Sequence, residues 1–193
     1  MKKEFSVYVF RHGQTTYNRD QRFTGFDNPG LTSLGIKHAK TIAKKLKNKQ
    51  FNISFYTRLK RSKQTLKEVL KYHPECKTLI KDDRMIERNY GRLNGLTHDT
   101  FIKKYGEQEY NLIHRGYNIP PPGGESFAMV ENRVRKFIKD LKILIKKEKC
   151  SVAISAHGNS IRLFRKTMES ASKKEACKWV IPYDKVFEYK IKA

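Results

Sequence analysis

The sequence predicts an α/β protein, organised as a three-layer α/β/α sandwich around a mainly parallel sheet. Short apolar runs alternate along the chain with longer segments whose apolar residues recur at helical spacing, which is the pattern of strands joined by crossover helices. The last apolar run, 186–191, alternates strictly with polar residues and is therefore expected to be an edge strand at the C-terminus. No repeat or linker divides the 193 residues, so a single domain is expected over 1–193.

The first half of the chain contains three expected strands and two expected helices. The apolar run at 7–10 stops at Arg11, where a polar loop begins. Thr32 or Ser33 is a suitable N-cap for the first helix. The elements expected before residue 85 are a strand at 5–10, a helix from about 33 to 46, a strand at 51–55, a helix from 59 that ends before Pro74, and a strand at 78–80.

The second half begins with a polar loop at 87–96 and a short helix at 98–105 that ends at Gly106. Residues 120–124 are all proline or glycine, and they can form neither a helix nor a central strand. The remaining elements expected are a long helix opened by Glu125 and Ser126, a strand at 152–156, a helix from Ser160, and the closing strand at 186–191. The stretch 90–122 is the least regular, and it is expected to cover the functional pocket as an irregular insertion.

The charge balance is strongly basic, with 42 lysines and arginines against 19 acidic residues and a net charge of +23 at pH 7. Such a field attracts polyanions. The lysines are nevertheless dispersed along the expected helices, and no basic arm, zinc finger or aromatic RNA-binding motif accompanies them. They are therefore expected to be solvated helix faces, and nucleic acid is not expected as a partner.

Neither a membrane segment nor a signal peptide is expected. No apolar run approaches the ~20 residues that span a bilayer. The start of the chain, 1–4, is basic, but Arg11 and His12 interrupt the apolar stretch that follows too early for an h-region of roughly 7–15 residues. The protein is therefore expected to be cytoplasmic, with its three scattered cysteines reduced.

Two of the expected strands end in the same dipeptide. The first is followed by His12-Gly13 and the other by His157-Gly158. The carboxyl ends of parallel strands meet at one edge of a sheet, where open α/β sheets bind their ligands. The two imidazoles are therefore expected to face one another across a single pocket.

These residue types suit phosphoryl chemistry. A neutral imidazole can attack phosphorus and hold the phosphoryl group, which splits one transfer into two easier ones. Phosphoryl transfer also needs cations on the phosphoryl oxygens, and Arg11, Arg61 and a protonated His157 are candidates. Glu87 is the candidate for the general acid that protonates the leaving oxygen.

Arg11-His12-Gly13 together with His157-Gly158 resembles the histidine phosphatase superfamily. Within it, the chain is similar to the cofactor-dependent (2,3-bisphosphoglycerate-dependent) phosphoglycerate mutases almost from end to end. The segments that carry this resemblance are RHGQTTYN, RFTGFDNPGLTSLG, LKRSKQTL, ERNYGRLNGLT, KYGEQEYNLIHRGYNIPPPGGES, SAHGNS and IPYDKVFEYKI. The blocks around Glu87, Pro120 and His157 favour the mutase branch over general phosphatases.

The resemblance implies a phosphoglycerate mutase-like fold and a role for each matching residue. His12 would be the phosphorylated nucleophile, and Glu87 would donate and accept the proton. Arg11, Arg61 and His157 would form the phosphate pocket with help from Asn18, Gly158 and Asn159. The implied substrate contacts are Thr24, Gly25, Arg88, Tyr90, His98, His114 and Arg115. Mutases of this kind are primed by 2,3-bisphosphoglycerate and need no metal.

Three departures from the mutase pattern bear on activity. His98 stands where the pattern has a lysine, and His114 stands where it has the first of two adjacent arginines. The sequence also stops just after its last strand, without the C-terminal tail that many of these mutases carry over the pocket. Titratable imidazoles would hold a carboxylate-plus-phosphate substrate less tightly, and a missing lid would favour hydrolysis.

Three hypotheses of function follow. The first is a phosphoglycerate mutase that interconverts 3-phosphoglycerate and 2-phosphoglycerate through a phosphohistidine. The second is a phosphomonoester phosphatase that uses the same site with water as the acceptor. The third is an inactive family member that binds polyanions through its basic surface, which the complete catalytic set argues against. The expected partner is a small phosphorylated substrate, and since relatives are often dimers or tetramers, a homo-oligomer fits the resemblance.

Overall fold

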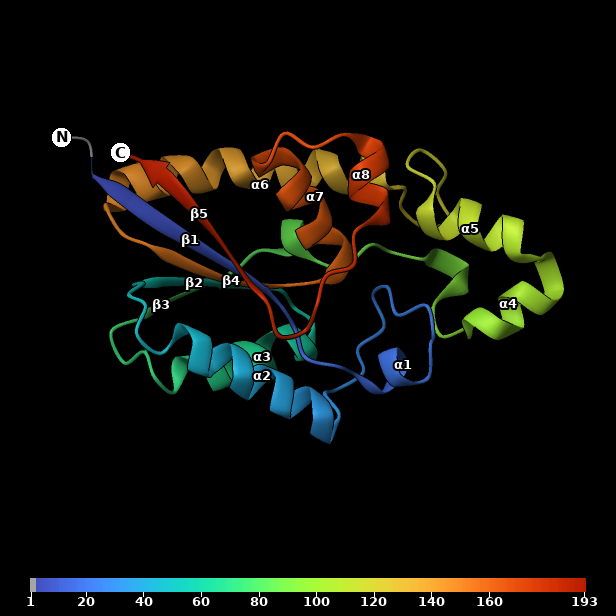
Figure 1. Ribbon diagram of the computed structural model, residues 1–193, viewed down its shortest axis with the longest axis horizontal. Coiled ribbons are helices and arrows are strands. Elements are labelled where there is room, and N and C mark those ends of the chain that lie inside the picture. Colours follow the sequence, from blue (N-terminus) through green and yellow to red (C-terminus); the bar gives the residue numbers. More distant parts are fainter. Residues whose placement is uncertain (1–2) are drawn as a thin grey trace.

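The computed structural model of the protein describes residues 3–193, so Met1 and Lys2, which begin the basic N-terminal run, lie outside the described residues. The described chain has a sheet between two layers of helices (Figure 1). This architecture confirms the α/β/α sandwich that the sequence predicts.

Five strands form the sheet, in the order β3-β2-β4-β1-β5. They are β1 (Glu4–Arg11), β2 (Ile53–Tyr56), β3 (Thr78–Lys81), β4 (Val152–Ala156) and β5 (Val186–Lys192). The first four run parallel, whereas β5 pairs antiparallel with β1. The sheet is therefore mainly parallel, and the C-terminal strand lies at its edge as expected. Arg11 pairs with Ala156 in the register of β1 and β4, so the chain leaves both central strands at the same edge.

The helices cover the two faces of the sheet. Helices α6 and α7 lie on one face, and α2 and α3 lie on the other, while α4 and α5 project to one side (Figure 1). The helices are α1 (Thr16–Arg19), α2 (Ser33–Leu46), α3 (Lys60–Leu70), α4 (His98–Tyr105), α5 (Glu107–Arg115), α6 (Phe127–Glu148), α7 (Gly158–Met168) and α8 (Lys173–Lys178), with 3-10 turns η1 (Asp83–Met85) and η2 (Gly91–Leu93).

The alternation of side chains along β1 explains the two layers. Val7 and Val9 pack in the core with α6 and α7, whereas Tyr8 and Phe10 pack in a second core with α2 and α3. Successive strand residues point to opposite faces of a sheet, so one strand serves both cores. Since its apolar residues are buried on both faces, β1 is a nearly continuous apolar run.

Several helix boundaries follow from capping residues that the sequence analysis singled out. The Thr32 hydroxyl accepts a hydrogen bond from the Gly35 amide at 2.9 Å, and the Ser126 hydroxyl accepts one from the Met129 amide at 3.2 Å. Side-chain oxygens at the N-cap satisfy amides that have no partner within the helix. Helix α4 spans the expected residues and ends at Gly106, whose φ of 86° suits a glycine.

The region 90–122 is more regular than the sequence analysis expected. It contains η2, α4 and α5. Helix α5 was not predicted from the sequence, and neither were α1 and α8, which lie outside this region. Helix α5 has nine residues and only Ile113 among them is buried, so few contacts hold it against the rest of the fold. Strand β3 also differs from the expected apolar strand, because it lies at the outer edge and its Leu79 is 49% exposed.

None of the helices in the described part of the chain combines the length and the apolar character that crossing a bilayer requires.

Candidate active site

The two imidazoles meet where β1 and β4 end. The ring centroids of His12 and His157 lie 5.0 Å apart, and both residues are buried. A nitrogen of each ring and a carboxylate oxygen of Glu87 all lie within 4.8 Å of one another. The site that the strand endings predict is therefore a single cluster of two imidazoles and one carboxyl group.

Hydrogen bonds set the tautomer of His12. Its Nδ1 lies 2.7 Å from the carbonyl oxygen of Gly13, which only accepts hydrogen bonds, so Nδ1 carries the proton. Its Nε2 accepts a hydrogen bond from Arg61 Nε at 3.2 Å. Burial, and then the charges of Arg61 and Arg11, lower the pKa of His12 well below its usual value. The ring is thus neutral at pH 7, with a lone pair on Nε2, as a nucleophile requires.

Arg61 lies in the first turn of α3 and is fully buried. Its Nη1 donates to the carbonyl oxygen of Asp27 at 2.7 Å, and its Nη2 donates to that of Gly25 at 2.9 Å. Burial lowers the pKa of Arg61 to about 10, which leaves the guanidinium charged at pH 7. No carboxylate forms an ion pair with Arg61 among residues 3–193. A buried cation without a counter-ion favours the binding of an anion beside it.

Two further donors in the cluster have no partner. His157 Nε2 lies 2.8 Å from the hydroxyl of Thr57, and this hydroxyl accepts from the Leu59 amide at 3.4 Å. This contact fixes the orientation of the His157 ring, and in the tautomer that accepts from the Thr57 hydroxyl the ring proton is on Nδ1. His157 Nδ1 and Arg11 Nε are both buried and make no hydrogen bond within the described chain. An oxyanion bound between them would satisfy both groups.

In the ligand-free protein, His157 is not the protonated third cation that the sequence analysis considered. Burial, followed by the charges of Arg61 and the neighbouring His12, lowers the pKa of His157 well below its usual value. The ring is neutral at pH 7, and its contribution to an anion is a hydrogen bond from Nδ1.

Glu87 is held by two backbone amides. Its Oε1 accepts from the Arg88 amide at 2.8 Å and from the Asn159 amide at 3.1 Å. Asn159 belongs to the first turn of α7, so the carboxylate lies at the N-terminal end of that helix. The other oxygen, Oε2, receives no hydrogen bond from residues 3–193. Glu87 is therefore fixed in place with one oxygen available for proton transfer.

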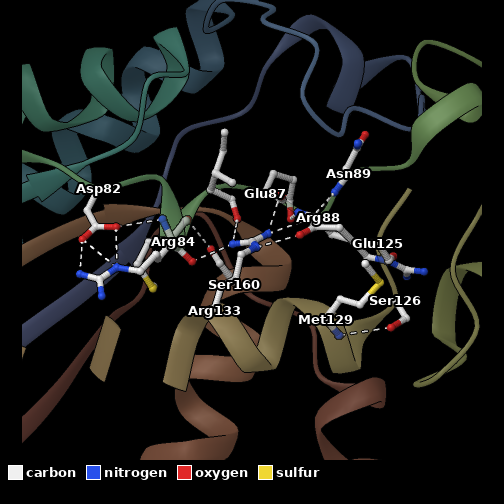
Figure 2. A network of polar contacts seen from close by, with 12 residues as sticks. Asp82, Arg84, Glu87, Arg88, Asn89, Glu125, Ser126, Met129, Arg133 and Ser160 are labelled. Atoms are coloured by element: carbon white, nitrogen blue, oxygen red, sulfur yellow. Dashed lines mark hydrogen bonds and ion pairs between the residues drawn. The ribbon is translucent and has the colours of Figure 1, made fainter. Parts of the chain in front are cut away.

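The segment that carries Glu87 is fixed by α6. Arg133 donates hydrogen bonds to the carbonyl oxygens of Arg84, Ile86 and Glu87 at 2.7 to 3.0 Å (Figure 2). The same guanidinium pairs with Glu125 at 3.0 Å. An arginine that binds three carbonyls in succession fixes the local backbone, and so positions the Glu87 side chain.

A cavity of about 200 Å³ opens in front of the cluster. Most of the sequence-predicted substrate residues line it, together with several that the sequence analysis did not name. The lining consists of Arg11, Asn18, Arg22, Phe23, Thr24, Gly25, Glu87, Tyr90, His98, His114, Arg115, Gly158, Asn159, Arg162, Val180 and Ile181. Behind this lining lie the buried side chains of His12, Arg61 and His157. The two imidazoles cluster with Glu87, and Arg61 donates to the carbonyl oxygen of Gly25.

Arg88 does not belong to the cavity, which corrects its assignment as a substrate contact. Its guanidinium is fully buried and donates to the carbonyl oxygens of Glu125 at 2.5 Å, Ile113 at 3.0 Å and Ile119 at 3.3 Å. Because these bonds occupy the fork of the guanidinium, Arg88 ties the end of α5 and the segment before the prolines to the loop of Glu87. Figure 2 shows Arg88 beside Glu125.

Two cavity arginines were missed from the sequence. Arg22 precedes the matched residues Phe23 and Thr24, and Arg162 lies one helical turn after Gly158 in α7. The spacing of Gly158 and Arg162 is the signal that was available, since residues four apart share a helix face. Burial lowers the pKa of Arg162 to about 10, so it too is charged at pH 7.

Three of the cavity arginines also hold the connection between α8 and β5, which forms part of the cavity wall. Each donates to a backbone carbonyl of that connection or of the end of α8. The bonds join Arg115 to Cys177 at 3.2 Å, Arg162 to Trp179 at 2.7 and 3.1 Å, and Arg11 to Ile181 at 2.9 Å. An anionic ligand in the cavity would compete with these carbonyls for the same guanidiniums.

The imidazoles that replace two cations of the mutase pattern are uncharged. His98 and His114 pack on the ring of Phe23, with centroid distances of 4.6 and 6.1 Å. Burial, and then the charge of Arg115, lowers the pKa of His114 to about 3 and also lowers that of His98. In the ligand-free protein these two rings are therefore not substitute cations near neutral pH. From helices α4 and α5, the lining of the cavity includes one fixed cation, Arg115.

The cluster of His12, Glu87 and His157 also has donor types that a metal ion could use. Its electrostatic environment argues against that use. Arg61 donates to the only lone pair of His12, and Arg11 lowers the pKa of both imidazoles through its charge. Two guanidiniums beside the cluster favour an anion over a cation.

The fold and these groups together define an α/β protein with a histidine-centred oxyanion site at the carboxyl edge of a mainly parallel sheet. The family follows from comparison with known proteins. The chain belongs to the histidine phosphatase superfamily (branch 1), whose family model matches residues 7–192. This confirms the resemblance on which the sequence analysis relied.

Curated relatives and solved structures extend this result. The chain is 35% identical over 174 residues to a 2,3-bisphosphoglycerate-dependent phosphoglycerate mutase of Parvibaculum lavamentivorans, covering 88% of this chain and 82% of the relative. It resembles the crystal structure of phosphoglycerate mutase from Bacillus anthracis str. Sterne, with a TM-score of 0.81 and 21% identity over 99% of this chain and 89% of the other. It also resembles a mycobacterial glucosyl-3-phosphoglycerate phosphatase, with a TM-score of 0.78 and 23% identity over 91% and 84% of the two chains. At these identities the two structures support the fold alone.

Proposed function

We propose that the protein is a phosphoglycerate mutase that interconverts 3-phosphoglycerate and 2-phosphoglycerate through a phosphohistidine at His12. The observation that carries this proposal is the neutral His12 ring, whose Nε2 lone pair lies beside Arg61. A nitrogen of this ring, a nitrogen of His157 and an oxygen of Glu87 lie within 4.8 Å of one another. The relatives named as mutases, at about 35% identity over most of the chain, favour the mutase reaction.

Each residue of the cluster has a role in this reaction. Nε2 of His12 attacks phosphorus, a P–N bond forms, and the P–O bond to the departing oxygen breaks. Glu87 gives its proton to that oxygen and takes a proton from the acceptor hydroxyl in the return transfer. Arg11 and Arg61 stabilise the charge that develops on the phosphoryl oxygens, and His157 donates a hydrogen bond to them.

The groups present fit 2,3-bisphosphoglycerate, which supplies the phosphoryl group that primes His12. The unpartnered donors, His157 Nδ1 and Arg11 Nε, suit one phosphate. The other arginines that line the cavity, Arg22, Arg115 and Arg162, suit the remaining anionic groups of the molecule.

A phosphatase is the second candidate, and one observation favours it. His98 and His114 are uncharged where the mutase pattern has fixed cations, so fewer positive charges in the cavity are available to hold an anionic intermediate. An intermediate that leaves before the second transfer exposes the phosphohistidine to water. Hydrolysis would then regenerate His12 and release inorganic phosphate.

One assay separates the two candidates. The protein is incubated with 3-phosphoglycerate and catalytic 2,3-bisphosphoglycerate, and 2-phosphoglycerate and free phosphate are measured together. The mutase proposal expects 2-phosphoglycerate to form much faster than phosphate. Predominant release of phosphate would overturn it in favour of the phosphatase.

The His12→Ala variant tests the shared intermediate. We expect it to lose both activities and to take up no acid-labile label from ³²P-labelled 2,3-bisphosphoglycerate, because no other ring nitrogen is placed for attack. His157→Ala is the matched control, since it removes the second imidazole but leaves the nucleophile and should still become labelled. Labelling of the His12→Ala variant would refute His12 as the nucleophile.

A further inference from the structure

A groove of about 660 Å³ lies on the α6 side of the molecule, outside the candidate active site. Helix α6 contributes Arg135, Lys136 and Lys139 to it, and α8 contributes Lys173. The three α6 cations lie on the exposed side of an amphipathic helix, because Val134, Phe137 and Ile138 between them are buried. Cations that are dispersed in the sequence therefore converge along one groove.

Most of these charges are not neutralised by the protein itself. Lys166 pairs with Glu131 at 2.8 Å inside the groove. Arg135, Lys136, Lys139 and Lys173 form no ion pair with a carboxylate in the described chain, residues 3–193. Unpaired cations that line a concave surface reinforce one another's field and attract an extended anion.

The groove continues toward the active site. A second hollow shares Tyr117 and Lys173 with it, and adds Lys174 and Lys178. This second hollow shares Arg115 with the catalytic cavity. A continuous series of cations thus runs from the mouth of the cavity along α8 to α6.

Tyr117 lies in the middle of this path. The ammonium group of Lys173 lies 4.8 Å from the centroid of its ring, and that of Lys166 lies 5.9 Å from it. The groove also presents the amides of Asn118 and Asn132. Aromatic rings between cations are the arrangement that binds single strands, because bases stack on the rings while phosphates pair with the cations.

We propose that this groove binds single-stranded nucleic acid, and RNA is the ligand that tests this proposal. An acidic peptide or an anionic membrane surface would pair with the cations, but neither would supply a base to stack on the Tyr117 ring. The proposal differs from the expectation from sequence that the lysines are solvated helix faces. The proposal does not depend on the mutase reaction, since its residues lie outside the catalytic cluster.

The test compares two triple variants of equal net charge by fluorescence anisotropy with a labelled 20-nucleotide poly(U) RNA. Lys136→Gln/Lys139→Gln/Lys173→Gln removes three groove cations. Lys40→Gln/Lys44→Gln/Lys67→Gln removes three exposed lysines from α2 and α3, on the opposite face of the sheet. Both variants should keep the wild-type turnover of small phosphorylated substrates, because neither changes a residue of the catalytic cavity.

We expect the groove variant to bind RNA about tenfold or more weakly at 150 mM salt, and the α2–α3 variant to bind like the wild type. The slope of log K against log salt is negative, and each phosphate contact that is lost reduces its magnitude by about 0.7, so three lost contacts reduce it by about 2. Equal weakening in both variants would overturn the proposal, because it would show attraction by total charge alone. Absence of RNA binding by the wild type at 150 mM salt would also overturn it.

A competition experiment tests the class of ligand. Polyglutamate and inorganic polyphosphate of similar charge should compete with the RNA much more weakly than unlabelled poly(U) does. Tyr117→Leu should weaken RNA binding, whereas Tyr117→Phe, which keeps the ring, should not. Equal competition by polyglutamate, or unchanged binding by a Tyr117→Leu variant with a normal melting temperature, would overturn the assignment to nucleic acid.

Discussion

At the scale of single residues, the chemistry of the site depends on which ring nitrogen carries each proton. In His12 the Gly13 carbonyl oxygen makes that selection, whereas in His157 the Thr57 hydroxyl holds Nε2 and so fixes the orientation of the ring. Neither partner is charged, so both rings stay neutral while their orientation is fixed. Thr57 is therefore a positioning residue, and its effect on phosphoryl chemistry acts through His157.

This role predicts the effect of Thr57→Val. The variant keeps the shape of the side chain but removes the hydrogen bond to His157 Nε2, so the ring is free to rotate and to change tautomer. We expect kcat to fall about tenfold or more, with a smaller change in KM, because a misplaced donor mainly costs transition-state stabilisation.

Thr57→Ser is the matched control for this prediction. It keeps the hydroxyl and should retain most of the wild-type kcat. The ¹⁵N chemical shifts of the His157 ring provide a second readout, since they should change in Thr57→Val and not in Thr57→Ser. Equal kcat values in the valine and serine variants would contradict the role of the hydroxyl.

At the scale of elements, the connection from β1 to α2 places the nucleophile. The Gly13 amide donates to Thr65 Oγ1 at 3.0 Å, which ties the loop to α3. A Cβ on Gly13 would lie 2.1 Å from the carbonyl oxygen of Gly35, in the first turn of α2. The loop and the helix can therefore approach one another only because residue 13 has no side chain.

Gly13→Ala should consequently destabilise the protein. The clash is with backbone, which cannot rotate away, so we expect the free energy of unfolding to fall by about 1–3 kcal/mol or more. Gly30→Ala is the matched control, because a Cβ there would meet only the Gln64 side chain at 3.7 Å. Its effect should stay within about 0.5 kcal/mol. Chemical denaturation measures both, and equal stabilities would contradict the packing argument.

The same elements show what the sequence could predict. Strands β1 and β4 were predictable because each is an apolar run that ends in His-Gly, and the convergence of His12 and His157 followed from the rule for parallel strands. Helix α5 was not predicted: it has only nine residues, it follows α4 directly at Gly106, and it leads into the proline segment, so the whole stretch was interpreted as irregular.

Side-chain direction set the limit within the site. Glu87 and Arg88 are adjacent in the sequence, yet one carboxylate reaches the cluster while the neighbouring guanidinium reaches α5. Thr57 follows a short strand and carries no motif, so only its contact with His157 reveals its role. Such contacts depend on tertiary packing, which spacing along one strand or helix does not encode.

At the scale of the whole molecule, the protein is strongly basic, yet the histidines of the site are buried and neutral. Burial lowers the pKa of His12, His157 and His114, and nearby arginines lower it further. Each ring binds a proton less readily in the folded chain than in the unfolded chain. The folded state therefore holds fewer protons than the unfolded state wherever the pH lies between the two pKa values.

This difference predicts a loss of stability in mild acid. The stabilisation from a histidine with a lowered pKa is fully present above its unfolded pKa, about 6.5, and is lost as the pH falls toward the folded value. The folded pKa of His114 is about 3, so this loss of stability continues from about pH 6.5 down to about pH 3. A difference of one bound proton changes the free energy of unfolding by about 1.4 kcal/mol per pH unit. Between pH 6.5 and pH 5, His114 alone therefore lowers the free energy of unfolding by at most about 2 kcal/mol.

The variant His114→Phe isolates this contribution. It keeps a planar ring against Phe23 but cannot titrate, so its free energy of unfolding should fall less than that of the wild type between pH 7 and pH 5. Urea denaturation at each pH, in buffers without phosphate, measures the difference between the two curves. Paired carboxylates such as Glu169, whose pKa is lowered, lose their contribution in more acidic solution, so they do not obscure this window. Parallel curves from pH 7 to pH 5 would contradict a neutral, buried His114.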